Sequence, residues 1–133
     1  MKKFSFIAVV LVTGLALAGC QKKDEVVAAP DELTVAITSP AEGSTFGAGT
    51  KVPIRATVSY PSELHGFQVT IRDAVSGESF FSFDEHVHSD HFVIDTAWMP
   101  TLGKTTALTA TITTAINHEG KQDSREVHFS VKL

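Results

Sequence analysis

The residues best suited to bind a metal ion in this 133-residue chain lie between positions 84 and 91, where three of the six histidines fall. His86 and His88 are two positions apart, so an extended backbone points both rings to the same side. A His-x-His pair on a strand can supply two imidazole nitrogens to one zinc ion at about 2.0–2.1 Å. His86 and His88 are therefore candidate metal ligands, and His91 is a further candidate.

A site built from imidazoles suits Zn²⁺ and Cu²⁺, and the general order of divalent affinities favours copper. Carboxylates near the histidines are candidates either for ligands or for acceptors that fix an imidazole tautomer. A solvated turn is the alternative interpretation of the same stretch, because histidines and carboxylates are common in exposed loops. The four acidic residues concerned are Asp84, Glu85, Asp90 and Glu119.

The N-terminal residues have the pattern of an export signal. Two lysines precede a mostly apolar stretch, residues 4–17, whose 14 residues are too few to span a hydrocarbon core of about 30 Å. Residues 1–19 therefore predict a signal peptide. The sequence Leu-Ala-Gly-Cys at 17–20 resembles a bacterial lipobox, which implies cleavage before Cys20 and lipidation of that residue. A plain secretory signal with an incidental cysteine is the alternative.

Cys20 is the only cysteine, so a lipidated chain has no thiol for a disulfide, for catalysis or for metal binding. Several acyl chains would make a stable membrane anchor. By resemblance to enterobacterial sorting, Gln21 in place of Asp implies the outer membrane. Residues 20–32 are polar and lack periodicity, which predicts a lipidated tether.

The charge and length of the remaining chain limit its partners and its domain count. Removing the two lysines of the signal takes the formal charge from −4 to −6. A mildly acidic domain without a basic cluster argues against a nucleic-acid partner. Residues 33–133 are enough for one domain with its own core.

Alternation of apolar and polar residues predicts an all-β domain. Seven antiparallel strands are expected, near residues 33–38, 52–59, 67–72, 81–83, 92–98, 108–116 and 127–133, with a break at 60–63. Thr, Val and Phe are abundant, as is typical of half-buried strands. The parity predicts that the core contains Val35, Val52, Ile54, Phe67, Val69, Ile71, Trp98, Ile112, Val127 and Phe129.

Residues 35–49 resemble the opening of bacterial Ig-like domains. The matching features are the Ser-Pro-x-x-Gly turn that begins at Ser39, followed by Phe46 and Gly49. The resemblance implies a single seven-stranded Ig-like sandwich over residues 33–133. It also implies a spacer, an adhesin or a binding module and leaves the activity open, because one fold serves many functions. Paired cysteines of the antibody type are missing from the sequence.

Topology predicts that histidines far apart in the sequence meet at one end of the sandwich. In an antiparallel sandwich the chain reverses at every turn, so alternate connections lie at the same end. This reasoning places His65, His86, His88 and His118 together, with His91 nearby. The third and sixth strands are neighbours in the usual pairing, so opposed side chains are about 5 Å apart. His128 is expected in mid-strand, facing outward.

Two functions are compatible with these observations. One is a membrane-anchored envelope lipoprotein with a non-catalytic Ig-like domain that binds Cu or Zn through His65, His86, His88 and His118. The other is an Ig-like module that docks an envelope protein or a cell-surface partner without metal. An enzyme is not expected, since the sequence has no nucleophile elbow and no phosphate-binding glycine loop before a helix.

Overall fold

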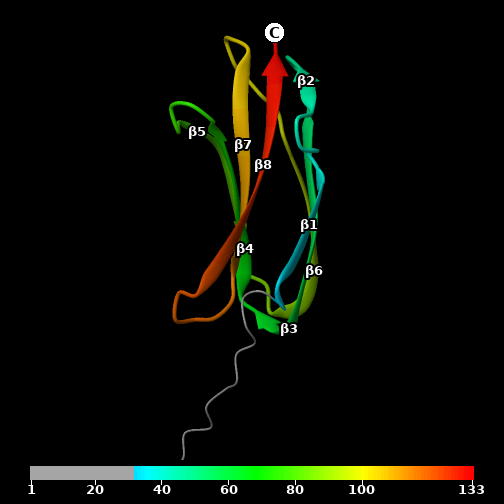
Figure 1. Ribbon diagram of the computed structural model, residues 1–133, viewed down its shortest axis with the longest axis vertical. Helices are drawn as coiled ribbons and strands as arrows, with labels where there is room; N and C mark the ends of the chain where they lie inside the picture. Colours follow the sequence, from blue (N-terminus) through cyan, green and yellow to red (C-terminus); the bar gives the residue numbers. More distant parts are fainter. Residues whose placement is uncertain (1–31) are drawn as a thin grey trace, which may run out of the picture.

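Two β-sheets packed face to face form the framework of residues 32–133, the part of the chain that the computed structural model describes (Figure 1). The expected signal peptide, residues 1–19, and tether residues 20–31 lie outside the described residues. Residues 32–133 include no helix that is long and apolar enough to cross a membrane.

The smaller sheet has three strands in the order β1 (Thr34–Ser39), β3 (Val52–Leu64) and β6 (Ser89–Trp98). Both pairings are antiparallel. The register aligns one residue from each strand, Thr34, Ser59 and His91, in a row across the sheet. The strand β1 therefore begins at the end of the sandwich where β3 finishes.

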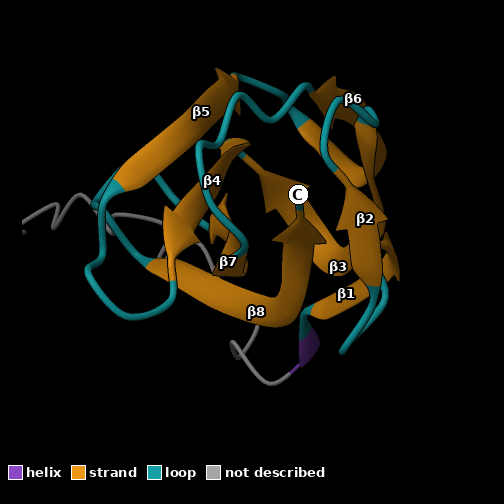
Figure 2. Cartoon of the chain, turned by 90° about the horizontal axis from the view of Figure 1, so that it is seen from above, coloured by secondary structure: helices purple, strands orange, loops and turns teal. Residues whose placement is uncertain are grey.

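The larger sheet has five strands in the order β2, β8, β7, β4 and β5. Their bounds are Thr45–Gly47 for β2, Gln122–Lys132 for β8, Thr106–Ala115 for β7, Gly66–Asp73 for β4 and Ser79–Glu85 for β5. Figure 2 looks down the sandwich and shows β5 and β6, the terminal strands of their respective sheets. As expected, the third and sixth segments of the sequence, now β4 and β7, are paired neighbours.

The all-β sandwich prediction is confirmed, but the described residues form eight strands instead of seven. The additional strand is β2, which lies between the first and second expected strands, and it pairs with β8 in parallel. Three residues are too few for alternation to stand out in a sequence. Packing explains the placement of β2, because the Phe46 ring meets the Phe129 ring edge-on at 5.9 Å.

The expected break at residues 60–63 is wrong, because β3 continues to Leu64. Its register with β6 shifts between Ser59 and Leu64. Pro61 lies in this interruption of the ladder, where the hydrogen-bond donor that proline lacks is not needed. His65 is then the one residue between β3 of the small sheet and β4 of the large sheet.

The core lies between the two sheets and follows the alternation of the strands. Every residue expected inside is buried except Val35, which is partly buried against the core. Leu64, Leu108 and Ile116 add fully buried side chains near the sheet ends. Burial of this kind contributes about 25 cal/mol per Å² of apolar surface, which makes the two apolar inner faces the main stabilising feature.

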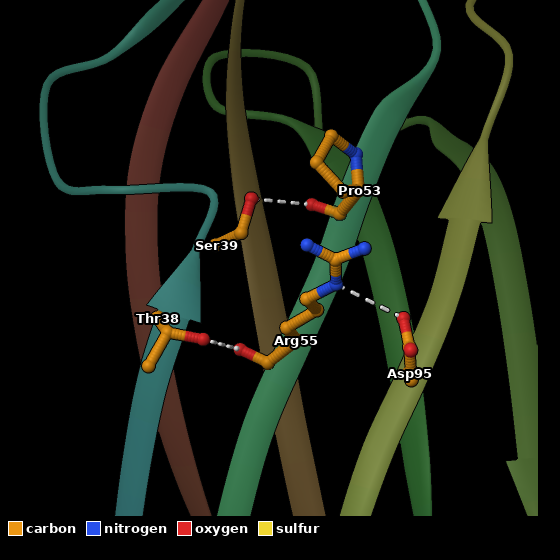
Figure 3. A network of polar contacts seen from close by, with 5 residues as sticks. All are labelled: Thr38, Ser39, Pro53, Arg55 and Asp95. Carbon is orange, nitrogen blue, oxygen red and sulfur yellow. Dashed lines mark hydrogen bonds and ion pairs between the residues drawn. The ribbon is translucent and has the colours of Figure 1, made fainter.

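A small polar network ties the three strands of the smaller sheet together on its outer side (Figure 3). Thr38 donates a hydrogen bond to the Arg55 carbonyl oxygen at 3.2 Å, and Ser39 donates one to the Pro53 carbonyl oxygen at 2.8 Å. Arg55 Nε donates to Asp95 Oδ1 at 3.1 Å. The Arg55–Asp95 pair is exposed and contributes at most about 1 kcal/mol.

Candidate functional site

Three separate connections bring four histidines to one end of the sandwich, the lower end in Figure 1. His65 joins β3 to β4, His86 and His88 lie between β5 and β6, and His118 lies in the loop between β7 and β8. We call these four residues the histidine pole. The antiparallel course of the strands puts all three connections at the same end, as the sequence predicted.

His65 is held by the backbone of the neighbouring strand. Its N–H donates a hydrogen bond to the Ala115 carbonyl oxygen at 2.9 Å, which fixes the β3–β4 connection against β7. The side chain is half-buried. Its Nδ1 atom is buried and has no hydrogen-bond partner among residues 32–133. Buried polar atoms in proteins normally have a partner, so this nitrogen is an exception that a bound ion would explain.

His118 lies in a loop that its own backbone and one side chain hold in shape. The Ile116 N–H donates to the Lys121 carbonyl oxygen at 2.8 Å and closes the loop. Asn117 Oδ1 accepts the backbone N–H groups of Glu119 at 3.1 Å and Lys121 at 2.9 Å. The His118 ring lies 3.8 Å from the His65 ring between centroids, tilted by 45°.

His86 and His88 complete the histidine pole. Their Nε2 atoms lie 2.9 Å apart, within hydrogen-bond distance. The His88 ring lies 5.1 Å from that of His65 and 5.8 Å from that of His118, and the His86 ring lies 6.5 Å from that of His118. The structure therefore brings all four expected candidates into one group of rings.

Three of these histidines have the spacing of a possible chelating set. One ring nitrogen from each of His65, His88 and His118 lies within 4.8 Å of the other two. Nitrogens bound to a tetrahedral zinc ion at about 2.05 Å would be about 3.4 Å apart, so a site needs contraction of at most about 1.4 Å. His88 and His118 are exposed, so small rotations of their side chains can supply such an adjustment.

A carboxylate that the sequence did not indicate contacts the histidine pole. Glu63 Oε1 lies 2.9 Å from His88 Nδ1. The candidates Asp84, Glu85, Asp90 and Glu119 form no ion pair with a histidine within residues 32–133. Pro61 led to the expectation of a break at residues 60–63. A strand expected to continue through Pro61 would have carried Glu63 to the histidine pole, because His65 follows two residues later.

The two remaining histidines lie apart from the pole. His91 is exposed on β6 opposite Ser59, and its ring contacts none of the four pole rings in the described part of the chain. His128 is exposed in mid-strand on β8, as expected, and its Nδ1 lies 3.4 Å from Glu42 Oε1. His128 is therefore a natural control for experiments on the pole.

The environment of His65 favours its neutral form. Burial lowers the pKa of His65, and the positive charges that His118 and His88 carry when protonated lower it further. The Glu63 carboxylate raises the pKa of His65, and His86 lowers it by a smaller amount than either of its histidine neighbours. A neutral imidazole is the form that binds a metal ion.

Gly66 allows the backbone at the histidine pole to pack closely, and sequence reasoning gave it no role of its own. Its φ angle is +132°, which L side chains rarely adopt. A pocket of about 210 Å³ opens beside it, lined in part by His65, His86 and Thr113. His65 and His86 therefore border a space that is open to solvent.

Comparison with known families identifies the domain. The profile of a family described as "Bacterial Ig domain" matches residues 34–121. The chain belongs to the bacterial Ig domain family. The match covers every strand of the Ig domain from β1 to β7 and all three connections that carry the pole. Such Ig domains are in general non-catalytic modules.

Two solved structures resemble the Ig domain. A fibronectin(III)-like module of CbhA from Clostridium thermocellum is 20% identical, with a TM-score of 0.47, over 74% of this chain and 96% of that one. A CARDB domain from Pyrococcus furiosus, solved in complex with di-metal ions, is 16% identical, with a TM-score of 0.42, over 76% of this chain and 94% of that one. No curated protein matches the chain.

Proposed function

We propose that the chain is a lipid-anchored envelope protein whose Ig domain binds a Cu²⁺ or Zn²⁺ ion at the histidine pole. The observation that carries this proposal is the spacing of His65, His88 and His118, whose ligand atoms lie within 4.8 Å of one another. These residues come from three different connections of the sandwich. Exposure to solvent alone does not explain why histidines from three connections converge in this way.

The chemistry of His65 supports a metal ligand at this position. Its Nδ1 is buried without a partner within residues 32–133, and its lowered pKa favours the neutral ring. An ion would satisfy the lone pair that the protein leaves unpaired. A buried polar group without a partner costs about 1–3 kcal/mol, so pairing it with a metal would remove this cost.

The donor atoms determine the class of metal. Imidazole nitrogens suit Cu²⁺ and Zn²⁺, whereas Mg²⁺ and Ca²⁺ prefer oxygen ligands. Affinity should fall as the pH drops through about 6.5, the ordinary pKa of histidine, because protonation removes the lone pair. We expect copper to bind more tightly than zinc.

The anchor would keep the pole near a membrane. The fold places the start of β1, through the row Thr34, Ser59 and His91, at the same end as the histidine pole. Fourteen residue steps separate Cys20 from Thr34, a reach of roughly 50 Å at full extension. A lipid on Cys20 would therefore confine the metal site to the zone next to the bilayer, and Gln21 favours the outer membrane.

Calorimetric titration of the untagged protein in detergent with Zn²⁺ or Cu²⁺ tests the proposal. We expect binding to raise the unfolding temperature, because a ligand of the native state stabilises by mass action. Changing His86 and His88 together to Ala should remove most of this metal-induced rise in unfolding temperature, whereas His128→Ala should leave the rise nearly intact. Equal losses from the two variants would mean adventitious surface binding, and the Ig domain would then be better explained as an interaction module for an envelope partner.

A further inference from the structure

Glu63 contacts the histidine pole from the strand that leads into it. Its Oε1 atom lies 2.9 Å from His88 Nδ1, with 59% of the Glu63 side chain and 45% of the His88 side chain exposed. Glu63 lies in the part of β3 where the register with β6 is interrupted, between Ser59 and Leu64. The ladder resumes at the pair Leu64–Ser89, so Glu63, the residue before Leu64, lies beside His88, the residue before Ser89.

The contact decides which nitrogen of His88 carries the proton. An ionised carboxylate accepts hydrogen bonds and cannot donate them, so the bond to Glu63 requires a proton on His88 Nδ1. The neutral ring then has its lone pair on Nε2. That atom is the one that lies 2.9 Å from His86 Nε2, so in the metal-free protein His86 donates a hydrogen bond to it. Both nitrogens of His88 thus have defined and opposite roles.

We propose that Glu63 is the positioning residue of the metal site. It holds His88 in the Nδ1-protonated tautomer, so that the Nε2 lone pair is presented to the ion. The inference rests on the proposed function. It also specifies the donor atom of His88 and a carboxylate–histidine–metal arrangement that the sequence did not indicate. Such outer partners orient the ring and raise its basicity, and their loss typically weakens metal binding 10- to 100-fold.

No other carboxylate forms an ion pair with a histidine of the pole among residues 32–133. Glu63 is the one carboxylate in an ion pair with a histidine of the pole, since the other His–carboxylate pair joins His128 to Glu42 far along β8. Glu119 lies next to His118 in the sequence and forms no ion pair in residues 32–133. It offers a matched control, because its removal deletes one negative charge near the pole without touching His88.

Nuclear magnetic resonance of the ¹⁵N-labelled, metal-free protein in detergent tests the positioning directly. We expect the His88 ring to carry its proton on Nδ1 in the wild type, and Glu63→Ala to shift it toward the mixture of tautomers found in solution. Glu63→Gln should preserve the Nδ1 proton, because the amide oxygen still accepts a hydrogen bond. A wild-type His88 protonated on Nε2 would overturn the proposal.

Zn²⁺ titration of the same proteins supplies the second measurement. Glu63→Ala should weaken binding 10- to 100-fold, Glu63→Gln should weaken it less, and Glu119→Ala should change it by no more than about threefold. If Glu63→Ala and Glu119→Ala weakened Zn²⁺ binding to a similar degree, the effect of Glu63 would be that of its negative charge alone. That result would refute the positioning role. A wild type that binds no Zn²⁺ would refute the proposed function, whereas the tautomer measurement decides separately what Glu63 does to His88.

Discussion

Gly66 lies so close to the strand beside it that a Cβ built on it would be 2.5 Å from the Glu85 carbonyl oxygen and 3.1 Å from the His86 Cα. Ordinary Cβ atoms do not approach backbone atoms this closely. The glycine thus sets the distance between β4 and the start of the β5–β6 connection. It does so at the residue that precedes His86, where β5 ends and the histidine pole begins.

Replacing Gly66 by Ala should therefore damage both stability and metal binding. Its φ of +132° adds a backbone cost of about 1–3 kcal/mol to the steric conflict. We expect denaturant unfolding to show at least this loss and Zn²⁺ titration to show weaker binding. Gly103→Ala is the control, because a Cβ there meets nothing within 4 Å and the φ is ordinary. A Gly66→Ala protein as stable as Gly103→Ala would contradict the close approach.

The stability of the metal-free protein should depend on pH through His65. Its pKa is lowered in the folded state, first by burial and then by His118 and His88, so the unfolded state binds a proton more readily. The stabilising contribution of neutral His65 is fully present above about pH 6.5, the unfolded value, and is lost as the pH falls below it. Glu63 opposes this shift, and His86 adds to it.

Urea unfolding between pH 5 and 8 with a chelator present measures this dependence. The free energy of unfolding should fall toward low pH in the wild type and fall less steeply in His65→Gln, which cannot titrate. An identical pH profile for the two proteins would show that the other histidines account for the whole dependence.

Trp98, at the end of the sandwich opposite the histidine pole, should be costly to remove. Its side chain is 8% exposed and stacks on Phe80 of β5 with 6.3 Å between ring centroids. Trp98→Ala should destabilise the domain by about 3–5 kcal/mol, the usual range for a buried large aromatic. Val93→Ala on the same strand is the control, since Val93 is 64% exposed, and should cost less than about 1 kcal/mol. Ready quenching of the Trp98 fluorescence by a soluble quencher would contradict its burial.

Lipidation at Cys20 can be measured independently of the fold. We expect the mature protein to partition into a detergent phase, because acyl chains contribute about 0.8 kcal/mol for each buried CH₂ group. Cys20→Ala should leave an unlipidated and mislocalised precursor. A Cys20→Ala protein that is still acylated and anchored in the envelope would be incompatible with the lipobox, whatever metal the domain binds.

Alternation in the sequence was sufficient to determine the class of fold and most of the core. Residues such as Ile54, Val69 and Ile112 share the parity of an inner face, and burial of that face is the dominant stabilising term. The antiparallel reversal of the chain was also enough to send His65, His86, His88 and His118 to one end. Both results follow from local periodicity and connectivity, which can be read directly from a sequence.

Tertiary structure alone decided the short strand β2, the continuation of β3 through Pro61, and the contact between Glu63 and His88. Each depends on packing or register between segments distant in the sequence, where a shift of one residue reverses the direction of every side chain. Pro61 indicated a turn at 60–63 because the preference of proline for turns can be read from the sequence. The interrupted ladder that accommodates Pro61 exists only once β3 and β6 have paired. The same pairing gave His88 its acidic partner.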